Sequence, residues 1–563
     1  MILISGCGEE PSPSNTRTEP PPDELRIPFN GVVKSIDPGW IISEANQVEL
    51  IEQLFLGLTT LEKSTYKVVP RLARKWETNE DGTVYTFSLR QDVKWSDDKP
   101  VTAHDVVWTI QRNFKISGGM NAAFGMLKNA QLNQEKLEKD KQADISSLGV
   151  RAFDEHTVQF TLEDQLPFFP ALVSYAPYRP LPSWVIEKHG DQWAKPANIQ
   201  SNGPYMLTEW KADKLTLAKN PKYYDANKVK ISKVHYHIVS RSLTGLAMYE
   251  KNQLDIIGGT NYLRLPQTEL PRIKSDMILS KDLKGGFEAC TEWYGFNTQR
   301  YPTNDLQVRK AIAAAIDKQL LIDVVLKSNH TLAKTFTPPL MLGWKIKPEK
   351  RCPSSEEEGL FGIPFCPEKA RKELEQAHKE KVKKANVHQD KKIVLLHNIN
   401  ETHSATAKGI QTLLKHYLGI DIEVEVLDYD SYQKQITVYS TVPIQKRPHI
   451  FRASWCGSYP EAYLWVDAFN PEYGWYKWLL DGNEHQKEFS EIVGKIPLTS
   501  NKTERVLLYR RAEEILTNKA VVMMPFFFEN APVLVKPRVK GWYHMAYGGQ
   551  HIYDWSLEKQ KKE

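Results

Sequence analysis

Hydrophobic positions near the start of the chain predict one helix followed by a hairpin. Val48 to Phe55 repeats apolar residues at helical spacing, and Gly57 marks the end of that helix. Two segments with alternating apolar residues, 70–76 and 84–90, flank the dipeptide Asp81-Gly82. Because this dipeptide suits a tight turn between strands, we expect an antiparallel hairpin here.

The pattern changes further along the chain, where strand and helix periods follow one another. Residues 393–396 form an apolar run typical of a buried strand, and 404–418 carry apolar residues on one helical face. Gly419 stands where a helix C-cap belongs, and 420–426 alternate as a second strand. This order predicts a βαβ unit with parallel strands. We expect 131–144 to be a solvated surface excursion and 367–384 a highly charged helix.

The stretch from Phe451 to Tyr459 is the candidate functional segment. An apolar run leads into it, so it leaves the end of a buried strand. Arg452 can bind a carboxylate through two hydrogen bonds, Trp455 offers a wide apolar face, and Gly457 permits close approach of the backbone. The alternative interpretation is a core strand that ends in a turn, with Arg452 in a surface ion pair.

Composition places the chain among multidomain globular proteins. Its 563 residues exceed what a single core usually holds, so two to four domains are expected. The content of 41% hydrophobic and 25% charged residues is ordinary for a folded protein. The net charge of +5 is small and well mixed, which argues against a nucleic-acid partner. The 15 Trp and 24 Tyr suit aromatic-lined surfaces, and equally an aromatic core.

The first residues resemble the end of a bacterial lipoprotein signal. Met1 to Gly6 is a short apolar run ending in small residues, and Cys7 stands where a lipidated cysteine belongs. Residues 9–24 are rich in Pro, Ser, Glu and Thr, which predicts an extended tether. The basic start is missing, which suggests a truncated or misplaced first residue. The alternative is a free cysteine near a frayed terminus. No other stretch is apolar enough to span a bilayer.

Cysteine usage favours an exported protein. If Cys7 carries a lipid, four cysteines remain, and these allow three disulfide pairings. Cys352 and Cys366 flank a polar segment that contains glycine and form a natural short loop closure. Four reduced core thiols are the alternative. No metal-binding spacing appears, so no metal site is expected.

Signatures of catalysis are missing from the chain. We find no G-x-S-x-G, H-E-x-x-H, P-loop or dinucleotide fingerprint, and the 15 His are scattered. We therefore expect neither enzyme activity nor a cofactor. A hydrolase is rejected for want of a nucleophile and a base.

Several motifs follow one another along the chain. They begin with a predicted helix N-cap at Thr102, followed by Asp105 at the third position. The further motifs are 201–205 with Trp210, 220–225, 290–297, 305–317 and Trp455-Cys456. Taken in this order, they resemble the motifs of the family 5 extracytoplasmic solute-binding proteins, the oligopeptide-binding group of ABC transporters, and the resemblance covers nearly the whole chain.

The resemblance implies an α/β fold with two lobes, the type II, cluster C periplasmic-binding-protein fold, built as three domains with a hinge. Residues 1–24 would be the signal remnant and tether. The main domain of lobe 1 would combine 25–57, 195–289 and 527–563, with an extra domain at 58–194, and lobe 2 would be 290–526. The resemblance also supports a disulfide between Cys290 and Cys456.

The implied function is the substrate-binding component of an ABC importer. Such proteins hold an extended peptide as an added strand and close their lobes over it. They then deliver it to a permease in the inner membrane. The implied protein is a monomer in the periplasm or another extracytoplasmic space, anchored to the membrane through lipid. The alternatives are a binder of murein peptides or another solute on this fold, or a surface receptor or adhesin without transport.

The resemblance also assigns ligand contacts, with one departure. In peptide binders of the family, an Asp two residues after the site cysteine holds the ligand's α-amino group, and here that position is Ser458. A hydroxyl cannot neutralise a buried ammonium, so substrate identity is open, and Glu44, Glu292 or Glu461 are candidate replacements. The implied ligand-binding residues are Glu44, Ala45, Trp293, Tyr294, Arg452, Trp455, Cys456, Gly457, Ser458 and Tyr459.

Overall fold

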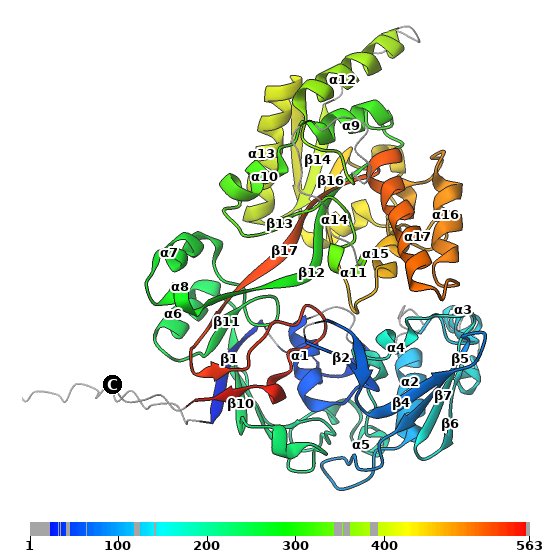
Figure 1. Ribbon diagram of the computed structural model, residues 1–563, viewed down its shortest axis with the longest axis vertical. Helices are drawn as coiled ribbons and strands as arrows, with labels where there is room; N and C mark the ends of the chain where they lie inside the picture. The colour runs from blue at the N-terminus through cyan, green and yellow to red at the C-terminus, as the bar shows by residue number, and fades with distance from the viewer. Residues whose placement is uncertain are drawn as a thin grey trace, which may run out of the picture.

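The computed structural model describes residues 23–558 except 32, 34, 41–44, 64, 117–123, 140–141, 343–351, 353–360 and 383–391. The fold is mixed α/β with two lobes, one above the other in Figure 1. Among the described residues, no helix has both the length and the apolar character that crossing a membrane requires.

The core of lobe 1 is a four-stranded sheet in the order β1-β10-β9-β8. β1 and β10 are parallel, although about 200 residues separate them, and the other neighbours are antiparallel. Helix α1 lies beside this sheet, and its buried Leu50, Ile51 and Leu54 fix it there. These elements are β1 (Glu24–Asn30), α1 (Ala45–Leu54), β8 (Tyr205–Trp210), β9 (Lys214–Lys219) and β10 (Lys233–Val239).

A second sheet of lobe 1, in the order β4-β5-β7-β6, confirms the predicted hairpin. β4 (Ala73–Thr78) and β5 (Val84–Leu89) are antiparallel, and Gly82 in their turn has a φ of 71°. Helix α2 (Ala103–Ile116) begins at the predicted cap, where the Asp105 amide donates to the Thr102 hydroxyl. The other two strands are β6 (Val150–Asp154) and β7 (Thr157–Thr161).

Lobe 2 is a three-layer structure around the sheet order β17-β12-β16-β14-β15. The predicted βαβ unit is present, with β14 (Ile393–Asn398) and β15 (Ile422–Leu427) parallel around α13 (Glu401–Leu418). Gly419 caps α13 in the left-handed conformation, with a φ of 69°. One face of the sheet packs against α9, α12 and α13, and the other against α14 to α17.

Two long antiparallel strands, β12 (Leu283–Phe296) and β17 (Met523–Val535), run from one lobe into the other (Figure 1). Their lower halves pair beside β11 (Ile256–Gly258) in lobe 1, and the upper half of β12 pairs with β16 (Ile450–Cys456) in lobe 2. The pairing of β12 with β17 shifts register between Phe287 and Thr291. This irregularity lies between the two lobes.

The charged segment at 367–384 forms the expected helix, α12 (Pro367–Val382). The described part of 131–144 is largely exposed, as expected for a surface excursion, but it also contains a helix that the sequence did not predict, α3 (Ala130–Glu138), in which Ala130 and Asn133 are buried.

The other elements are β2 (Thr59–Leu61), β3 (Val68–Pro70), α4 (Phe169–Leu172), α5 (Ser183–His189), α6 (Ser242–Glu250), α7 (Leu270–Ser275), α8 (Leu279–Asp282), α9 (Leu306–Ala314), α10 (Lys318–Leu320), β13 (Thr331–Leu332), α11 (Pro339–Leu342), α14 (Tyr429–Ile436), α15 (Tyr463–Val466), α16 (Gln486–Lys495), α17 (Lys502–Glu514), β18 (Val539–Lys540) and β19 (Ser556–Leu557).

Candidate ligand-binding site between the lobes

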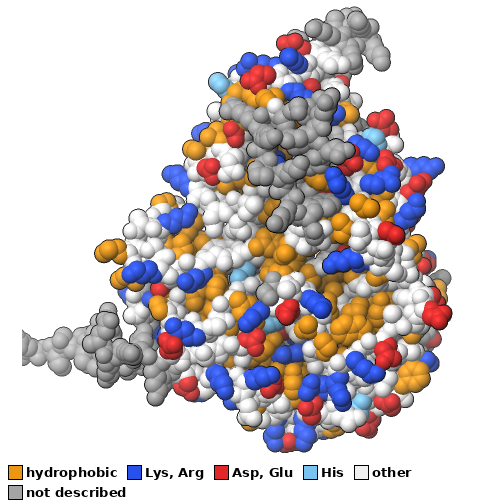
Figure 2. Space-filling model, in the orientation of Figure 1, with side chains coloured by type: hydrophobic (Ala, Val, Ile, Leu, Met, Phe, Trp, Pro, Cys, Tyr) orange, Lys and Arg blue, Asp and Glu red, His pale blue; other side chains and the backbone are white. Residues whose placement is uncertain are grey.

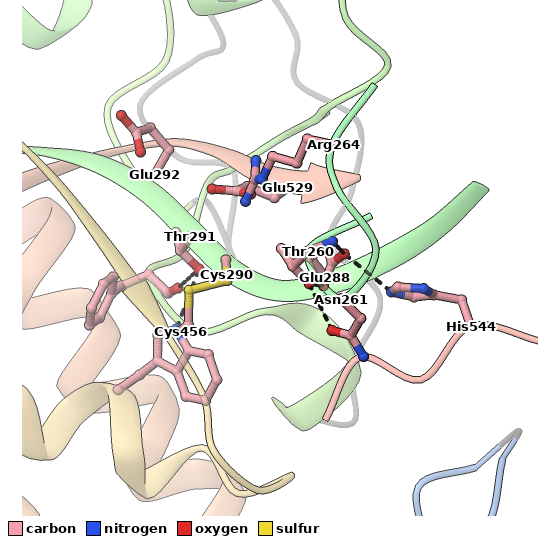
Figure 3. Close-up of a disulfide and its surroundings, with 12 residues drawn as sticks. Thr260, Asn261, Arg264, Glu288, Cys290, Thr291, Glu292, Cys456, Glu529 and His544 are labelled. Carbon is pink, nitrogen blue, oxygen red and sulfur yellow. Dashed lines mark hydrogen bonds and ion pairs between the residues drawn. A yellow bond between two sulfur atoms is a disulfide. The ribbon is translucent and has the colours of Figure 1, made fainter. Parts of the chain in front are cut away.

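Strand β16 carries the candidate functional segment to the edge of lobe 2. Cys456 at its end lies directly opposite Cys290 of β12, and the two form a disulfide with 4.1 Å between the Cα atoms (Figure 3). Cys352 and Cys366 form the second disulfide. Both predicted pairings are therefore confirmed. The first one ties the candidate segment to one of the two strands that connect the lobes.

Arg452 is held by a carboxylate of its own chain. Its guanidinium donates from two nitrogens to the two oxygens of Glu292, each at 2.5 Å. Both side chains are largely buried. Burial raises the pKa of Glu292, and Arg452 partly offsets that rise. Sequence reasoning assigned the counterion of Arg452 to a ligand, whereas Glu292 supplies it here. A direct contact between Arg452 and a ligand stays a prediction.

Trp293 and Tyr294 point to opposite faces of the lobe 2 sheet. Trp293 packs within an aromatic cluster with Phe451 and Tyr476, and Tyr294 packs edge-on against Phe526. Their exposed fractions are 0% and 1%. Because each ring belongs to one of the two cores that flank the sheet, contact with a ligand would require these cores to rearrange.

The end of β16 and the residues after it pack within lobe 2 and reach lobe 1 at Tyr459. The Trp455 indole donates to the Leu464 carbonyl at 2.9 Å. A Cβ on Gly457 would lie 2.1 Å from the Trp465 ring, so a side chain has no room there. Tyr459 stacks on Phe168 of lobe 1, with 6.3 Å between ring centroids. This segment therefore forms part of the contact between the lobes.

A small cavity of about 20 Å³ lies where this segment meets lobe 1. In Figure 2, hydrophobic side chains gather over the middle of the visible face, and charges of both signs are mixed over the rest. Ser458 is the contribution of lobe 2 to the cavity lining. The lining residues from lobe 1 are Val48, Glu52, Thr60, Leu61, Ser174, Tyr175, Ala176, Arg179, Met545, Tyr547, Gly548 and His551.

The cavity wall contains a buried ion pair between Glu52 of α1 and Arg179. Arg179 also donates to the Phe55 carbonyl, at the end of the same helix. Burial lowers the pKa of His551 to about 4, so its imidazole is neutral near pH 7. Burial also raises the pKa of Tyr175 to about 12, partly offset by a hydrogen bond to Ser458.

Sequence reasoning missed Glu52, Arg179, Tyr547 and His551. A signal was available for Glu52, because Val48, Ile51 and Phe55 place it on the apolar face of its helix. A carboxylate on that face needs a buried partner. The other three residues carry no local signal, since segments distant in sequence bring them together.

The three expected replacements for the missing Asp differ in their surroundings. Glu44 lies outside the described residues. Its neighbour Ala45, which is another predicted ligand contact, is the first residue of α1. Glu292 is paired with Arg452. Glu461 accepts a hydrogen bond from the Tyr509 hydroxyl at 2.5 Å, and burial raises its pKa. Glu292 and Glu461 therefore already have partners within the chain.

A second polar cluster lies beside the disulfide on the side of lobe 1 (Figure 3). Glu288 of β12 accepts hydrogen bonds from the Thr260 amide and hydroxyl, and its carboxylate lies 3.4 Å from the His544 imidazole. Burial alone would raise the pKa of Glu288, but His544, Arg264 and the hydrogen bond from Thr260 together outweigh it, and the pKa falls. A Cβ on Gly286 would collide with the His544 ring. The C-terminal segment is thus fastened to the strand that crosses between the lobes.

Three potential metal ligands come together at Cys352, Cys366 and Glu368. The two sulfurs are joined in the second disulfide, so neither can bind a metal as a thiolate. Cys7, the expected lipid attachment site, lies outside the described residues.

Comparison with known proteins gives a consistent result. Residues 67–477 match the family model described as "Bacterial extracellular solute-binding proteins, family 5 Middle". The chain is 28% identical over 518 residues to the periplasmic oligopeptide-binding protein OppA of Salmonella typhimurium, covering 91% of this chain and 88% of OppA. It is also 28% identical over 512 residues to the probable deoxycholate-binding periplasmic protein YgiS of Escherichia coli, covering 90% of this chain and 89% of YgiS.

Among solved structures, the unliganded open form of the periplasmic murein tripeptide-binding protein MppA superposes with a TM-score of 0.76. The two are 25% identical, and the alignment covers 96% of this chain and 98% of MppA. The two-lobed fold expected from the sequence is therefore confirmed.

Proposed function

The chain belongs to family 5 of the bacterial extracellular solute-binding proteins, and we propose that it captures peptides or peptide-like solutes for an ABC importer. The solute would bind between the lobes, and lobe closure would present the loaded protein to a permease in the inner membrane. Membership in a solute-binding family fits a protein without catalytic activity. The relatives OppA and MppA, whose names refer to peptides, support the peptide class.

One observation carries this proposal, namely that both lobes line one cavity. Ser458 follows the disulfide-bonded end of β16, and it faces Glu52 and Arg179 of lobe 1 across that cavity. A solute that contacts all three residues would hold the lobes together. This arrangement suits capture by closure, whereas a receptor or adhesin would need no enclosed site between its lobes.

We propose that the hinge lies in β12 and β17. The expected domain boundaries, 289/290 and 526/527, fall inside these two strands. The shift of register between Phe287 and Thr291 lies at the first boundary and reduces regular pairing there. Closure would therefore bend the pair of strands near Glu288, with 25–57, 195–289 and 527–563 as the main domain of lobe 1, 58–194 as its extra domain and 290–526 as lobe 2.

A binder of a solute other than a peptide is the second candidate function. It is favoured by Ser458 at the position where peptide binders carry an Asp, because a free α-amine gains no negative charge from a hydroxyl. The relative YgiS, named as a probable deoxycholate-binding protein, has the same extent of similarity to this chain as OppA.

We also propose that Cys7 carries the lipid that anchors the protein outside the cytoplasm. The support is the run Ile4-Ser5-Gly6-Cys7, followed by a Pro-rich tether. Expression of the precursor in a bacterium with two membranes, followed by mass spectrometry of the N-terminal peptide, tests this. An acylated Cys7 is expected, and a water-soluble product with an unmodified Cys7 would overturn the assignment.

The test of the proposed function uses a library of random tri- to pentapeptides. Native mass spectrometry should detect one-to-one complexes with the purified protein, and small-angle scattering should show a smaller radius of gyration for the loaded form. Bile acids, including deoxycholate, form the second arm of the titration. Binding in neither arm would contradict capture of either class of solute.

A further inference from the structure

The cavity between Ser458 and lobe 1 is built from segments that lie far apart in the chain. Helix α1 supplies Glu52, the stretch after α4 supplies Arg179, and the C-terminal segment supplies Tyr547 and His551. A Cβ on Gly549 would lie 2.5 Å from the Glu52 Cβ, so only glycine lets the C-terminal segment approach α1 this closely. The cavity is therefore a built site of lobe 1, with Ser458 added from lobe 2.

Arg179 has one donor group without a partner in the part of the chain that the structure describes. Its two terminal nitrogens donate to the Phe55 carbonyl and to Glu52, while its Nε has no hydrogen-bond partner among the described residues. The residue is only 5% exposed. A buried donor of a cationic group that lacks an acceptor costs free energy. We therefore expect an oxygen atom to accept a hydrogen bond from this N–H group.

Tyr547 adds a second unpartnered donor from the C-terminal segment. Its ring packs edge-on against Tyr66, with 5.3 Å between centroids, which fixes its orientation. The hydroxyl is buried and has no hydrogen-bond partner within the described parts of the chain. Arg179 and Tyr547 both line the cavity.

The negative charge on the cavity wall is already neutralised by an ion pair within the protein. Glu52 is the carboxylate among the lining residues, and it is ion-paired with Arg179. Its second oxygen lies 4.0 Å from the His551 imidazole, which burial keeps neutral near pH 7. An ammonium group entering the cavity would have to compete with Arg179 for Glu52, whereas an oxygen acceptor would meet two donors that have no partner among the described residues.

We infer that this cavity binds an oxygen acceptor of the solute, a carboxylate or an acyl carbonyl, through the Arg179 Nε and the Tyr547 hydroxyl. This inference rests on the proposed function and specifies its substrate class. The preferred solutes are acids or peptides with a blocked N-terminus. Tyr175, which is hydrogen-bonded to Ser458, borders the same cavity.

The test offers the protein three forms of one library of random tri- to pentapeptides, with a free, an N-acetylated or an N-succinylated α-amine. Native mass spectrometry of the equimolar mixture measures the enrichment of each form. We expect the two acylated forms to be enriched at least about tenfold over the free amine. Tyr547→Phe, which removes only the hydroxyl, and Arg179→Lys, which keeps the charge but removes the Nε donor, should each lower that ratio about threefold or more.

Tyr439→Phe is the matched control, because Tyr439 is 73% exposed and does not line the cavity, and it should leave the ratio unchanged. If the parent protein preferred the free amine and Glu52→Gln lost that preference, this inference would be overturned. Glu52 would then be identified as the amine partner. It would leave the proposed peptide capture intact. An equal affinity for all three forms would also overturn the inference. If no form binds, peptide capture itself fails, and the inference fails with it.

Discussion

Glu292 and Arg452 form a two-point ion pair diagonally across β12 and β16. Tyr294 is the direct neighbour of Arg452 in the register, and Glu292 pairs with Ser454, so both charged side chains lie on the same face of the sheet. The exposed fractions of the side chains are 13% for Arg452 and 6% for Glu292. A buried pair of this kind is costly to break from one side only, because the remaining charge loses its partner.

We therefore predict that Arg452→Ala acts first on stability. It should lower the free energy of unfolding by about 3–5 kcal/mol, because Glu292 remains buried without a counterion. In the double variant with Glu292→Ala, much of that loss should return. Denaturant unfolding of both single variants and of the double variant gives the coupling energy.

Arg272→Ala is the control for this cycle, since its pair with Glu250 is exposed and should contribute less than about 1 kcal/mol. If Arg452→Ala instead left stability unchanged and abolished solute binding, the guanidinium would be a ligand anchor, as the sequence first suggested.

The two disulfides should contribute unequally to stability. They close loops with sequence separations of 166 and 14 residues. The chain-entropy relation gives about 5 kcal/mol for the longer loop and about 3 kcal/mol for the shorter. Replacing Cys290 and Cys456 with Ala should therefore lower the melting temperature more than replacing Cys352 and Cys366. Calorimetry of the two double variants measures this, and the reverse order would show that the unfolded chain does not govern the effect.

Glu49 should make the protein less stable as pH rises. It is buried in α1, where it accepts hydrogen bonds from the Tyr236 and Tyr262 hydroxyls and the Gln550 amide. Burial raises its pKa from 4.5 to about 8, so the folded state holds a proton that the unfolded chain releases. The free energy of unfolding should fall between about pH 4.5 and 8, by at most about 1.4 kcal/mol per pH unit from this group.

Glu49→Gln tests this because it keeps the shape of the side chain and removes the titration. Its melting temperature relative to the parent protein should rise steadily from pH 5 to pH 8. The exposed Glu484→Gln serves as the control and should show no such trend. A constant difference for Glu49→Gln across this range would mean that Glu49 is ionised in the folded protein.

Ser458→Asp should restore affinity for free-amine peptides. The new carboxylate would stand where peptide binders of the family hold the α-amino group, and it would face Arg179 across the cavity. We expect free-amine peptides to gain at least about tenfold and acylated peptides to lose affinity. Calorimetric titration of one peptide in both forms measures the change. An equal gain for both forms would mean that position 458 does not sense the N-terminus.

Parts of the fold followed directly from local patterns. The βαβ unit around α13 and the hairpin at Gly82 depend on periodicity and turn chemistry within some thirty residues, so the sequence predicted them correctly. The sequence did not predict helix α3, because most of its residues are polar. Its buried residues, Ala130 and Asn133, give no apolar periodicity.

Much of the candidate site depends on contacts that no local pattern contains. The Glu292–Arg452 pair depends on the register of strands 160 residues apart. The cavity combines Glu52 with Arg179, 127 positions further along, and with the C-terminal segment. The sequence therefore predicted the segment that supplies Ser458. It did not predict the residues of lobe 1 that line the opposite side of the cavity.

Mass spectrometry of the small molecules that co-purify with the exported protein tests the central claim most directly. The protein is isolated from its native compartment without dialysis, and bound compounds are released by denaturation. We predict peptides or peptide-like acids in a near one-to-one ratio, enriched in blocked or acidic ends, and their loss from a variant that replaces both Arg179 and Tyr547. A protein that carries no small molecule, and that binds none when peptides and bile acids are supplied, would contradict solute capture.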